Sequence, residues 1–326
     1  MEFRTTIKTG EGNGLMSHSD KMMLIGSCFS DNIGARLRHA MVDALVNPTG
    51  TVFNPLSIAA TVRRIVDAEP VAGMDLFQQN GVWNSYDFHS RFSMAAKEAA
   101  LQRMNTRIEE AHSHLRLCDT LILTLGTAVV YRLRATGQVV ANCHKVPQHE
   151  FTRSMASVDE MVEALTATVE RLRNYNPGLH ILFTVSPIRH IADGLEMNSL
   201  SKASLRVAVG EVTRRYEGLA GYFPAYEIMM DDLRDYRFYA PDMVHPSEVA
   251  IDYIWQAFQA TYFDDRSTQA IARCERVSKR LQHRPMSHNR EVVERFNADT
   301  ALVVRNLVKE YPYIKEIKEI SDLLDD

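Results

Sequence analysis

The stretch KMMLIGSCFSDN, residues 21–32, decides the fold. Its apolar run at residues 22–25 stops at Gly26 and is followed at once by Ser27 and Cys28. A short continuous apolar run that ends at a glycine is typical of a buried strand in a parallel sheet covered on both faces. The segment that follows has the composition of a helix. A hydroxyl or thiol at such a turn lies beside unpaired backbone N–H groups, which suits a nucleophile and equally an ordinary helix N-cap.

Strands and helices alternate along most of the chain. Apolar segments predict strands at residues 22–26, 42–46, 119–126, 179–186 and 222–228. Helix-favouring segments predict helices at residues 30–41, from 54 or 55 onward, and at 95–115, 157–175, 200–217 and 249–262. Residues 129–143 are predicted to form a hairpin that turns at Thr136 and Gly137. This alternation predicts an α/β fold, a three-layer sandwich with a mostly parallel central sheet.

Length and composition exclude several classes of protein. The chain has 326 residues, 45% of them hydrophobic, and its formal net charge of −4 gives no sign of a nucleic-acid partner. No apolar stretch is long enough to predict a membrane span, and the N-terminal segment lacks the apolar core of a secretion signal. The four cysteines are far apart and show no CxxC spacing, so we expect no disulfide framework, no metal site and a reduced, cytoplasmic protein. The sequence predicts no cofactor.

The C-terminal segment differs from the rest of the chain. It contains no predicted strand, and its apolar residues recur near helical spacing: Val292, Phe296, Val303, Leu307 and Tyr311. We expect residues 1–264 to form the α/β domain and residues 265–326 to form a helical appendage. This appendage either packs along one face on the domain or joins two copies of the chain in a homo-oligomer.

A second signal is the segment APDMVHPSEVA, residues 240–250. Asp242 and His245 lie three positions apart, so both side chains can project from one side of a tight turn. A carboxylate beside an imidazole fixes its tautomer and stabilises the imidazolium, as a hydrolase base requires. The pair follows the last predicted strand, and ligands of such folds bind at the carboxyl ends of the strands, where Ser27 also lies. Ser27, His245 and Asp242 therefore form a candidate nucleophile, base and orienting carboxylate.

Glycine and serine after the first strand, with D-x-x-H near the end of the core, resemble the SGNH/GDSL hydrolase superfamily. The string GSCFS is similar to the segment that names the GSCFA-domain family. Other stretches that fit this family are NPTGTVFNPLSIA, DFHSRFS, LTLGTAVVY, VANCHKVP, TVSPIRHIADG with SKASL, and LRDYRFYAPDMVHPS, which together span roughly residues 20–260. The resemblance implies an SGNH-hydrolase or flavodoxin-like sandwich and acyl-transfer chemistry.

The resemblance assigns Ser27 as the nucleophile and places Asp242 and His245 in the last motif of the superfamily. In the implied mechanism His245 takes the Ser27 proton, the alkoxide attacks an ester carbonyl, and water or an acceptor hydroxyl receives the acyl group. Cys28 is an alternative nucleophile, because a thiol at a helix N-terminus has a lowered pKa. We expect Cys28 instead to face inward as a small apolar filler.

The resemblance also implies donors for the oxyanion. Gly50 matches the second-motif glycine, whose backbone N–H is expected to point at the oxyanion. The third motif, usually G-x-N-D, aligns on Gly126 and Thr127, and its asparagine donor is absent. Because losing one such donor typically costs about two to three orders of magnitude in rate, a working enzyme should replace it. Asn142, at the end of the predicted hairpin, is the expected replacement.

Further residues are candidates for a substrate pocket. His89 and the pair His144 and Lys145 stand among polar neighbours outside the predicted helices. Arg189 and His190 follow the fourth predicted strand, so they are expected to point towards the same end of the sheet. Each of these residues is also consistent with an ordinary role in bracing a loop.

Two hypotheses of function follow. The first is a serine esterase or acyltransferase of SGNH type whose partner is a small-molecule or glycan ester, such as an acetylated carbohydrate, with no nucleic-acid or membrane partner. The second is a non-catalytic ligand-binding or scaffold protein on the same α/β fold.

Overall fold

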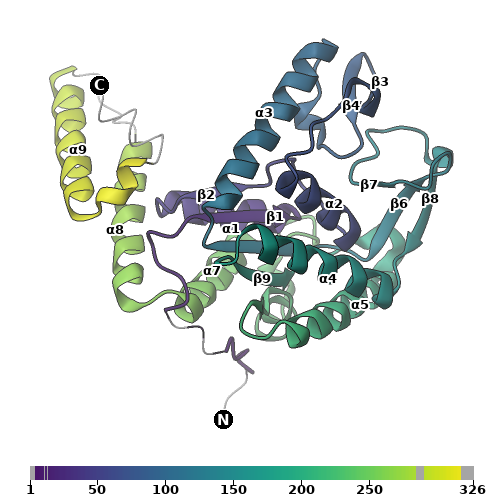
Figure 1. Cartoon of the computed structure of the whole chain (residues 1–326). Helices are drawn as coiled ribbons and strands as arrows, with labels where there is room; N and C mark the ends of the chain where they lie inside the picture. Colours follow the sequence, from purple (N-terminus) through teal and green to yellow (C-terminus); the bar gives the residue numbers. More distant parts are fainter. Residues whose placement is uncertain (1–3, 11, 13, 284–289, 317–326) are drawn as a thin grey trace.

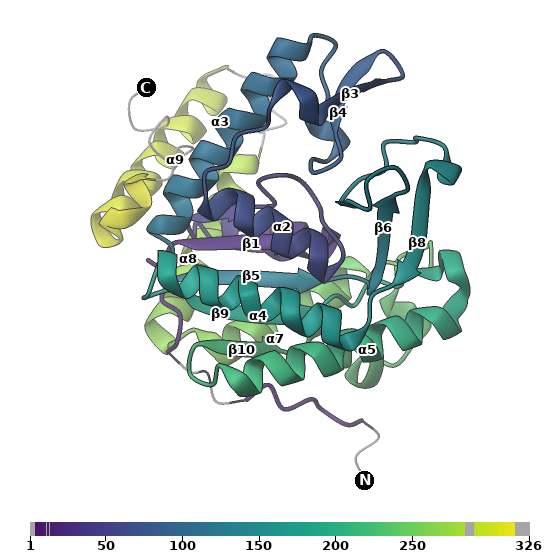
Figure 2. The same cartoon turned by 45° about the vertical axis from the view of Figure 1, so that its right-hand side comes forward.

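The computed structural model describes residues 4–10, 12, 14–283 and 290–316. Its centre is a sheet of five parallel strands in the order β10-β9-β5-β1-β2 (Figures 1 and 2). The strands are β1 (Met22–Gly26), β2 (Ala44–Val46), β5 (Thr120–Leu125), β9 (His180–Val185) and β10 (Ala220–Phe223). This is the order of flavodoxin-like folds, so the predicted fold class is confirmed. The order reverses between β1 and β5, and such a reversal is where ligands bind in these folds.

The burial of β1 explains the apolar run at residues 22–25. Every residue of β1 is buried, because helices cover both faces of the sheet. Side chains alternate along a strand, so Met22 and Leu24 face one helical layer while Met23 faces the other. Gly26 ends the strand at a close approach, where an added Cβ would lie 2.3 Å from the carbonyl oxygen of Thr124. Only glycine fits between the ends of β1 and β5.

Two helical layers enclose the sheet (Figure 2). One layer contains α2 (Pro55–Val66), α3 (Lys97–Arg116), α4 (Val158–Tyr175) and α5 (Gly194–Arg215). The other contains α1 (Cys28–His39) and α7 (Glu248–Tyr262). The three-layer sandwich predicted from the alternation of strands and helices is therefore the observed architecture.

Two antiparallel sheets lie outside the central one. β3 (Leu76–Gln79) and β4 (Val82–Ser85) form a hairpin that the sequence analysis did not predict. The hairpin predicted at residues 129–143 exists as β6 (Val129–Leu133) and β7 (Val139–Val140), but β8 (Phe151–Met155) pairs with the other edge of β6. The short strand β8 is mostly exposed and lacks the apolar alternation that identifies a strand in sequence.

The last core strand is shorter than predicted. A strand was expected at residues 222–228, whereas β10 ends at Phe223. Pro224 has no N–H to donate to a strand and is instead followed by α6 (Ala225–Glu227) and a π-helical turn (Ile228–Asp232). The first helix also differs from the expected 30–41, because Ser27 caps it and α1 begins at Cys28.

The C-terminal segment forms α8 (Asp265–Gln282), α9 (Arg290–Glu310) and a 3-10 helix (Pro312–Glu316). A separate apolar cluster joins these helices to the end of α1: Met41, Ala270, Cys274, Val277, Val304, Leu307, Tyr311 and Ile314. His18 strengthens the junction, since its ring nitrogens contact the Tyr313 hydroxyl and the Ala40 carbonyl, each at 2.7 Å. The predicted appendage is therefore helical in its described part and packs on the domain along one face. Its role in joining two copies stays a prediction.

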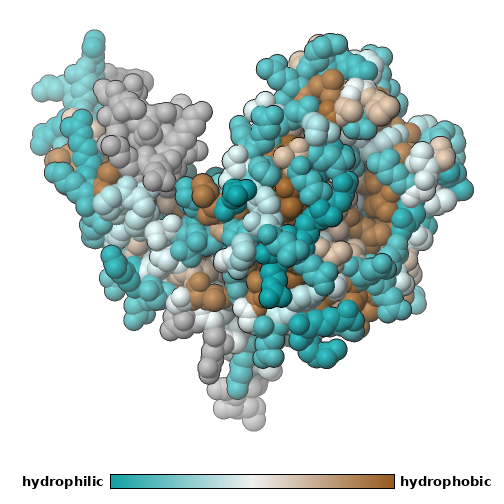
Figure 3. Space-filling view, viewed as in Figure 1, coloured by the Kyte–Doolittle hydropathy of each residue, from teal (hydrophilic) through white to brown (hydrophobic). Residues whose placement is uncertain are grey.

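The surface is hollowed between this C-terminal arm and α3 (Figure 3). Charged and polar side chains cover most of this face of the molecule. None of the helices in the described ranges combines the length and the apolar character that crossing a membrane demands.

Leu307→Ala is expected to lower the free energy of unfolding by about 2–5 kcal/mol, the usual cost of emptying a buried leucine site. Leu307 is 3% exposed within the cluster on α9. Leu302→Ala, on the same helix, is the matched control: Leu302 is 57% exposed, so its truncation should cost about 0.5 kcal/mol or less. Urea denaturation followed by circular dichroism measures both. Equal costs for the two variants would show that α9 does not pack as described.

Candidate active site

Ser27 stands where the strand order reverses. It is the N-cap of α1, and its Oγ accepts a hydrogen bond from the backbone N–H of Phe29 at 3.3 Å. Its own N–H donates to the carbonyl of Thr124 at 3.2 Å. Its Cβ lies 3.3 Å from the position that a Cβ on Gly126 would take, so Ser27 faces the residue that follows β5. Ser27 is only 1% exposed.

Asp242 and His245 form the predicted pair. Oδ2 of Asp242 contacts Nδ1 of His245 at 2.7 Å, while Oδ1 accepts the backbone N–H groups of Val244 and His245 at 2.9 and 3.0 Å. These backbone donors and the imidazole lower the pKa of Asp242 to about 2. One carboxylate therefore both builds the turn and orients the ring. The His245 side chain is 46% exposed, so the pair lies at the surface.

Arg189 attaches the His245 turn to the end of β9. Its backbone N–H donates to the carbonyl of Val244 at 3.2 Å. Its guanidinium lies over the Tyr239 ring, 4.0 Å from the centroid, and 5.3 Å from that of Tyr236. The side chain predicted as a pocket residue thus stacks on the loop that carries His245. Within the described structure no hydrogen bond joins His245 to Ser27 Oγ.

His190 is the imidazole that lies nearest to the Ser27–Gly126 contact. Its Nε2 lies 3.2 Å from the position of a Cβ on Gly126, and its ring meets that of Phe53 edge-on with centroids 5.8 Å apart. Its backbone N–H donates to Asn198 Oδ1 at 2.9 Å. Burial is the largest cause that lowers the pKa of His190, and with the smaller effects of Lys202 and His245 in the same direction the pKa falls to about 4. The ring is therefore neutral at pH 7.

Lys202, on α5, is a site residue that sequence reasoning missed. Its side chain is buried, and Nζ donates to the carbonyls of Gly126 at 2.6 Å and Ser186 at 2.7 Å. Burial lowers the pKa of this ammonium to about 7. The lysine ties together the residues that follow β5 and β9. The signals in the sequence were the stretch SKASL that fits the family and a charge on the buried side of a predicted helix.

The predicted backbone donors have internal acceptors in this structure. Gly50 N–H donates to the carbonyl of Asn47 at 2.8 Å, so it is not the free oxyanion donor that was expected. Gly50 is required instead by its φ of 94° and by His89, whose Cβ would lie 2.1 Å from an added Cβ. Gly126 and Thr127 both donate to the carbonyl of Phe53, at 2.7 and 3.0 Å.

Thr127 braces the loop after β5. Its hydroxyl contacts the Ser201 hydroxyl at 3.1 Å, and Ser201 also accepts the backbone N–H of Ala128 at 2.8 Å. The side chain that was predicted to bind substrate is therefore occupied in holding this loop against α5.

His89, Asn142 and His144 lie near the segment that follows β4. His144 Nε2 contacts the carbonyl of Ser85 at 2.7 Å, and His89 Nδ1 accepts the backbone N–H of Arg91 at 3.2 Å. Burial lowers the pKa of both imidazoles. Both rings thus brace their loops, whereas Asn142 Nδ2 is buried with no hydrogen-bond partner among the described residues.

Unpartnered polar atoms concentrate around this end of the sheet. In the described part of the chain, five buried side-chain nitrogen or oxygen atoms lack a hydrogen-bond partner, and four belong to segments that follow the strands: Ser30 Oγ, Thr49 Oγ1, Asn142 Nδ2 and His190 Nε2. Buried polar groups are normally paired, because leaving one unpaired costs about 1–3 kcal/mol. Such groups mark a place where a ligand can supply the missing partners.

A protein-family comparison matches residues 21–258, which include Ser27, Asp242 and His245, to the GSCFA family. This chain belongs to the GSCFA family. Comparison with curated protein sequences gave no significant match.

Solved structures similar to this GSCFA chain include three carbohydrate esterases. A family two carbohydrate esterase from Clostridium thermocellum in complex with cellohexaose is 11% identical, with a TM-score of 0.36 over 75% of this chain and 64% of that chain. The acetyl xylan esterase Est2A from the rumen bacterium Butyrivibrio proteoclasticus is 11% identical, with a TM-score of 0.38 over 74% and 63%. A family 2 enzyme with a carbohydrate-binding domain from Corynascus thermopiles is 11% identical, with a TM-score of 0.37 over 79% and 68%. This chain spans less than two thirds of the length of the first two.

Cys28 of the GSCFA motif is not an activated thiol. Burial raises its pKa, and the neighbouring carboxylate of Asp31 raises it further. The side chain is partly buried against the cluster between the sheet and α7, as expected for an apolar filler. This environment argues against the cysteine nucleophile and leaves Ser27 as the candidate.

Across the ranges that the structure describes, no group of three or more His, Cys, Asp or Glu side chains is placed to hold a metal.

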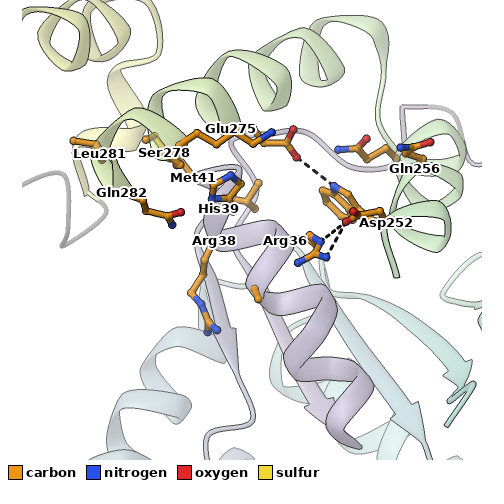
Figure 4. A pocket seen from close by; sticks show the side chains of 15 residues that line it. Arg36, Arg38, His39, Met41, Asp252, Gln256, Glu275, Ser278, Leu281 and Gln282 are labelled. Atoms are coloured by element: carbon orange, nitrogen blue, oxygen red, sulfur yellow. Dashed lines mark hydrogen bonds and ion pairs between the residues drawn. The ribbon is translucent and has the colours of Figure 1, made fainter. Parts of the chain in front are cut away.

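A cavity of about 1000 Å³ lies elsewhere in the GSCFA protein, between the C-terminal end of α1 and helices α7 and α8 (Figure 4). Polar side chains in its walls are hydrogen-bonded to one another: Arg36 donates to Asp252 at 2.8 Å, and Trp255 Nε1 donates to Glu275 at 3.3 Å. It lies at the opposite end of α1 from Ser27 and is separate from the candidate site.

His190 of the GSCFA protein is expected to stay neutral down to about pH 4. Because this pKa lies below the unfolded value of about 6.5, the unfolded state binds the proton first, and His190 lowers stability as the pH falls from about 6.5 towards 4. An NMR titration of the histidine side chains, assigned with a His190→Gln variant, measures this pKa. A His190 titration midpoint above pH 6 would contradict the burial of the ring and the effect of the nearby Lys202 charge.

Proposed function

We propose that this GSCFA protein is a serine esterase or acyltransferase that acts on an acylated carbohydrate, for example an acetylated one, or on a similar small polar ester. The observation that carries the proposal is the Asp242–His245 pair, joined at 2.7 Å beside the segment that follows β9. The family match supports Ser27 as the nucleophile. The substrate class is supported by the resemblance to the SGNH/GDSL superfamily.

The mechanism assigns one role to each residue. The His245 Nδ1–H donates to Asp242, which leaves Nε2 to accept the Ser27 proton. The Ser27 oxygen attacks the ester carbonyl at the N-terminus of α1, where the helix dipole favours developing negative charge. Asn142 Nδ2, buried and unpartnered, is proposed to donate to the oxyanion. Water or an acceptor hydroxyl then takes the acyl group from Ser27.

Substrate access requires a change of conformation. Ser27 is 1% exposed, and its Oγ is engaged as the cap of α1, so an ester carbonyl cannot reach it in this state. The His245 turn lies at the surface and carries exposed residues on both sides. The proposal therefore includes an opening movement that uncovers Ser27 and brings His245 within hydrogen-bond reach of it.

The burial of Ser27 favours one alternative, a non-catalytic binding protein. In that case the unpartnered side chains around Gly126 hold an acylated or anionic ligand, and Ser27 acts only as the cap of α1. An unactivated serine does not react with a fluorophosphonate probe, so labelling separates the two functions.

Ser27→Ala is expected to abolish hydrolysis of p-nitrophenyl acetate by the purified protein, because it removes the nucleophile. The lost cap should cost about 1 kcal/mol of stability, so the variant should remain folded. Circular dichroism and thermal unfolding check the fold, and release of p-nitrophenolate measures turnover.

Cys28→Ala is the matched control, one position along the same turn, and should keep its activity. Wild-type protein should also be labelled at Ser27 by a fluorophosphonate probe. Turnover that persists in Ser27→Ala, or wild-type protein that neither turns over ester nor reacts with the probe, would reject the esterase function.

A further inference from the structure

The first inference starts from the missing third-motif asparagine. The backbone N–H groups of Ser27, Gly50, Gly126 and Thr127 all donate to carbonyls within the protein, at 2.7 to 3.2 Å. These four expected backbone donors are therefore occupied, so we consider a side-chain donor to a carbonyl oxygen that gains negative charge beside Ser27. The donor must be buried, close to Gly126 and free of an internal acceptor.

His190 Nε2 meets these conditions. It is buried, has no partner among the described residues, and lies 3.2 Å from the point at which a Cβ on Gly126 would sit. The Cβ of Ser27 lies 3.3 Å from the same point, so the two side chains flank one small space. We infer that the His190 Nε2–H is a second hydrogen-bond donor to the oxyanion, in addition to the Asn142 amide; this inference rests on the proposed esterase function.

The surroundings of His190 suit a neutral donor. Lys202 contacts the opposite side of Gly126, through the carbonyl, and its positive charge disfavours a second positive charge on His190. Asn198 holds the His190 backbone and the Phe53 ring contacts the imidazole edge-on, so the ring has a fixed direction. A neutral imidazole can polarise a carbonyl by hydrogen bonding without giving up its proton.

Acylation of Ser27 by the ester needs no further reactant. The Ser27 oxygen forms a bond to the carbonyl carbon as His245 takes the hydroxyl proton, and the carbonyl π electrons move onto oxygen. The His190 Nε2–H stabilises this oxyanion and keeps its proton. When the tetrahedral intermediate collapses, the electrons return to the carbonyl and the alcohol leaves with the proton from His245.

The test compares His190→Ala with His190→Gln in p-nitrophenyl acetate hydrolysis. The alanine variant should lose about 10²–10³-fold in kcat with little change in KM, because the donor acts on the transition state. The glutamine variant keeps an N–H donor and should recover part of the rate. The acid limb of the kcat/KM profile should not move, since His245 remains the base.

His149→Ala removes an exposed histidine and is the control for loss of an imidazole elsewhere. Unchanged kcat in His190→Ala, or a shifted acid limb that marks His190 as the base, would overturn this inference while Ser27→Ala still supports the esterase. If the wild-type protein shows no Ser27-dependent turnover, the proposed function itself fails.

A second inference rests on a different part of the molecule. A groove of about 710 Å³ lies between α1 and α3, along the edge strand β2, whose Val46 lines it. This edge of the sheet faces the hollow between α3 and the C-terminal arm (Figures 1 and 3). Four guanidinium groups and two carboxylates line the groove: Arg38, Arg91, Arg103, Arg107, Asp31 and Glu110.

The positive charges of the groove are only partly offset. Arg107 pairs with Glu110 at 2.7 Å, and the side-chain amide of Asn47 donates to Asp31 at 2.9 Å. Within the described residues neither Arg38 nor Arg103 pairs with a carboxylate, and Arg103 instead contacts the sulfur of Met94 and the Phe92 ring. Burial lowers the pKa of Arg91, the Asp31 carboxylate raises it, and the neighbouring arginines lower it. The groove thus has excess positive charge on a chain whose net charge is −4.

We propose that this groove binds a sugar-sized ligand that carries phosphate or carboxylate groups. Guanidinium groups recognise both oxyanions through paired N–H donors. This inference does not depend on the esterase function.

Titration calorimetry at low salt with glucose 6-phosphate, glucuronate and glucose tests the site. It also shows whether the groove binds a phosphate or a carboxylate group. At least one anionic probe should bind, and glucose should not. The double variant Arg38→Gln/Arg103→Gln should weaken binding at least about tenfold, the effect of losing about 1.4 kcal/mol. Arg214→Gln/Arg234→Gln removes the same charge outside the groove and should leave binding unchanged. No binding of either anion, or equal weakening in both double variants, would overturn the proposal.

Discussion

A buried ammonium group holds the candidate site together. Lys202 donates to the carbonyls of Gly126 and Ser186, and so fixes the ends of β5 and β9 relative to one another. Burying a charge is costly unless it is hydrogen-bonded, so these two contacts are what make the lysine tolerable in the core. Burial keeps the neighbouring His190 ring neutral, and the Lys202 charge acts in the same direction. Loss of Lys202 would therefore alter both the shape of this edge of the sheet and its electrostatics.

The sequence predicted the parts of this protein that local patterns determine. The apolar run of β1, the glycine after it and the three-residue spacing of Asp242 and His245 are visible without a structure, and each is found where it was expected. The roles of Lys202 and His190 depend on contacts across many positions of sequence, so no local pattern reveals them. Pro224 was a visible signal that should have ended the predicted last strand.

The backbone N–H groups that were expected to bind an oxyanion also depend on contacts that the sequence does not reveal. Whether an N–H is free depends on which carbonyl the fold brings near it. Gly50 was predicted to point its N–H at an oxyanion, but that N–H is used within its own turn, and glycine is needed there because of the close approach of His89. Side chains such as His190 and Asn142 remain unpartnered because no neighbouring group reaches them. The proposed function assigns these unpartnered side chains to the ligand.

Ser27 Oγ caps α1, and the proposed esterase function asks the same oxygen atom to act as the nucleophile. As the N-cap of α1, its Oγ accepts the Phe29 N–H at 3.3 Å, longer than most strong hydrogen bonds. A cap of this kind contributes about 1 kcal/mol, so releasing the oxygen for attack costs little compared with the barrier to ester cleavage. The larger obstacle is the burial of Ser27, because it is relieved only when the surrounding loops move. In the proposed esterase the His245 turn is the part that moves, since its tip at residues 241–243 is exposed, whereas Tyr239 and Val244 on either side pack on the core.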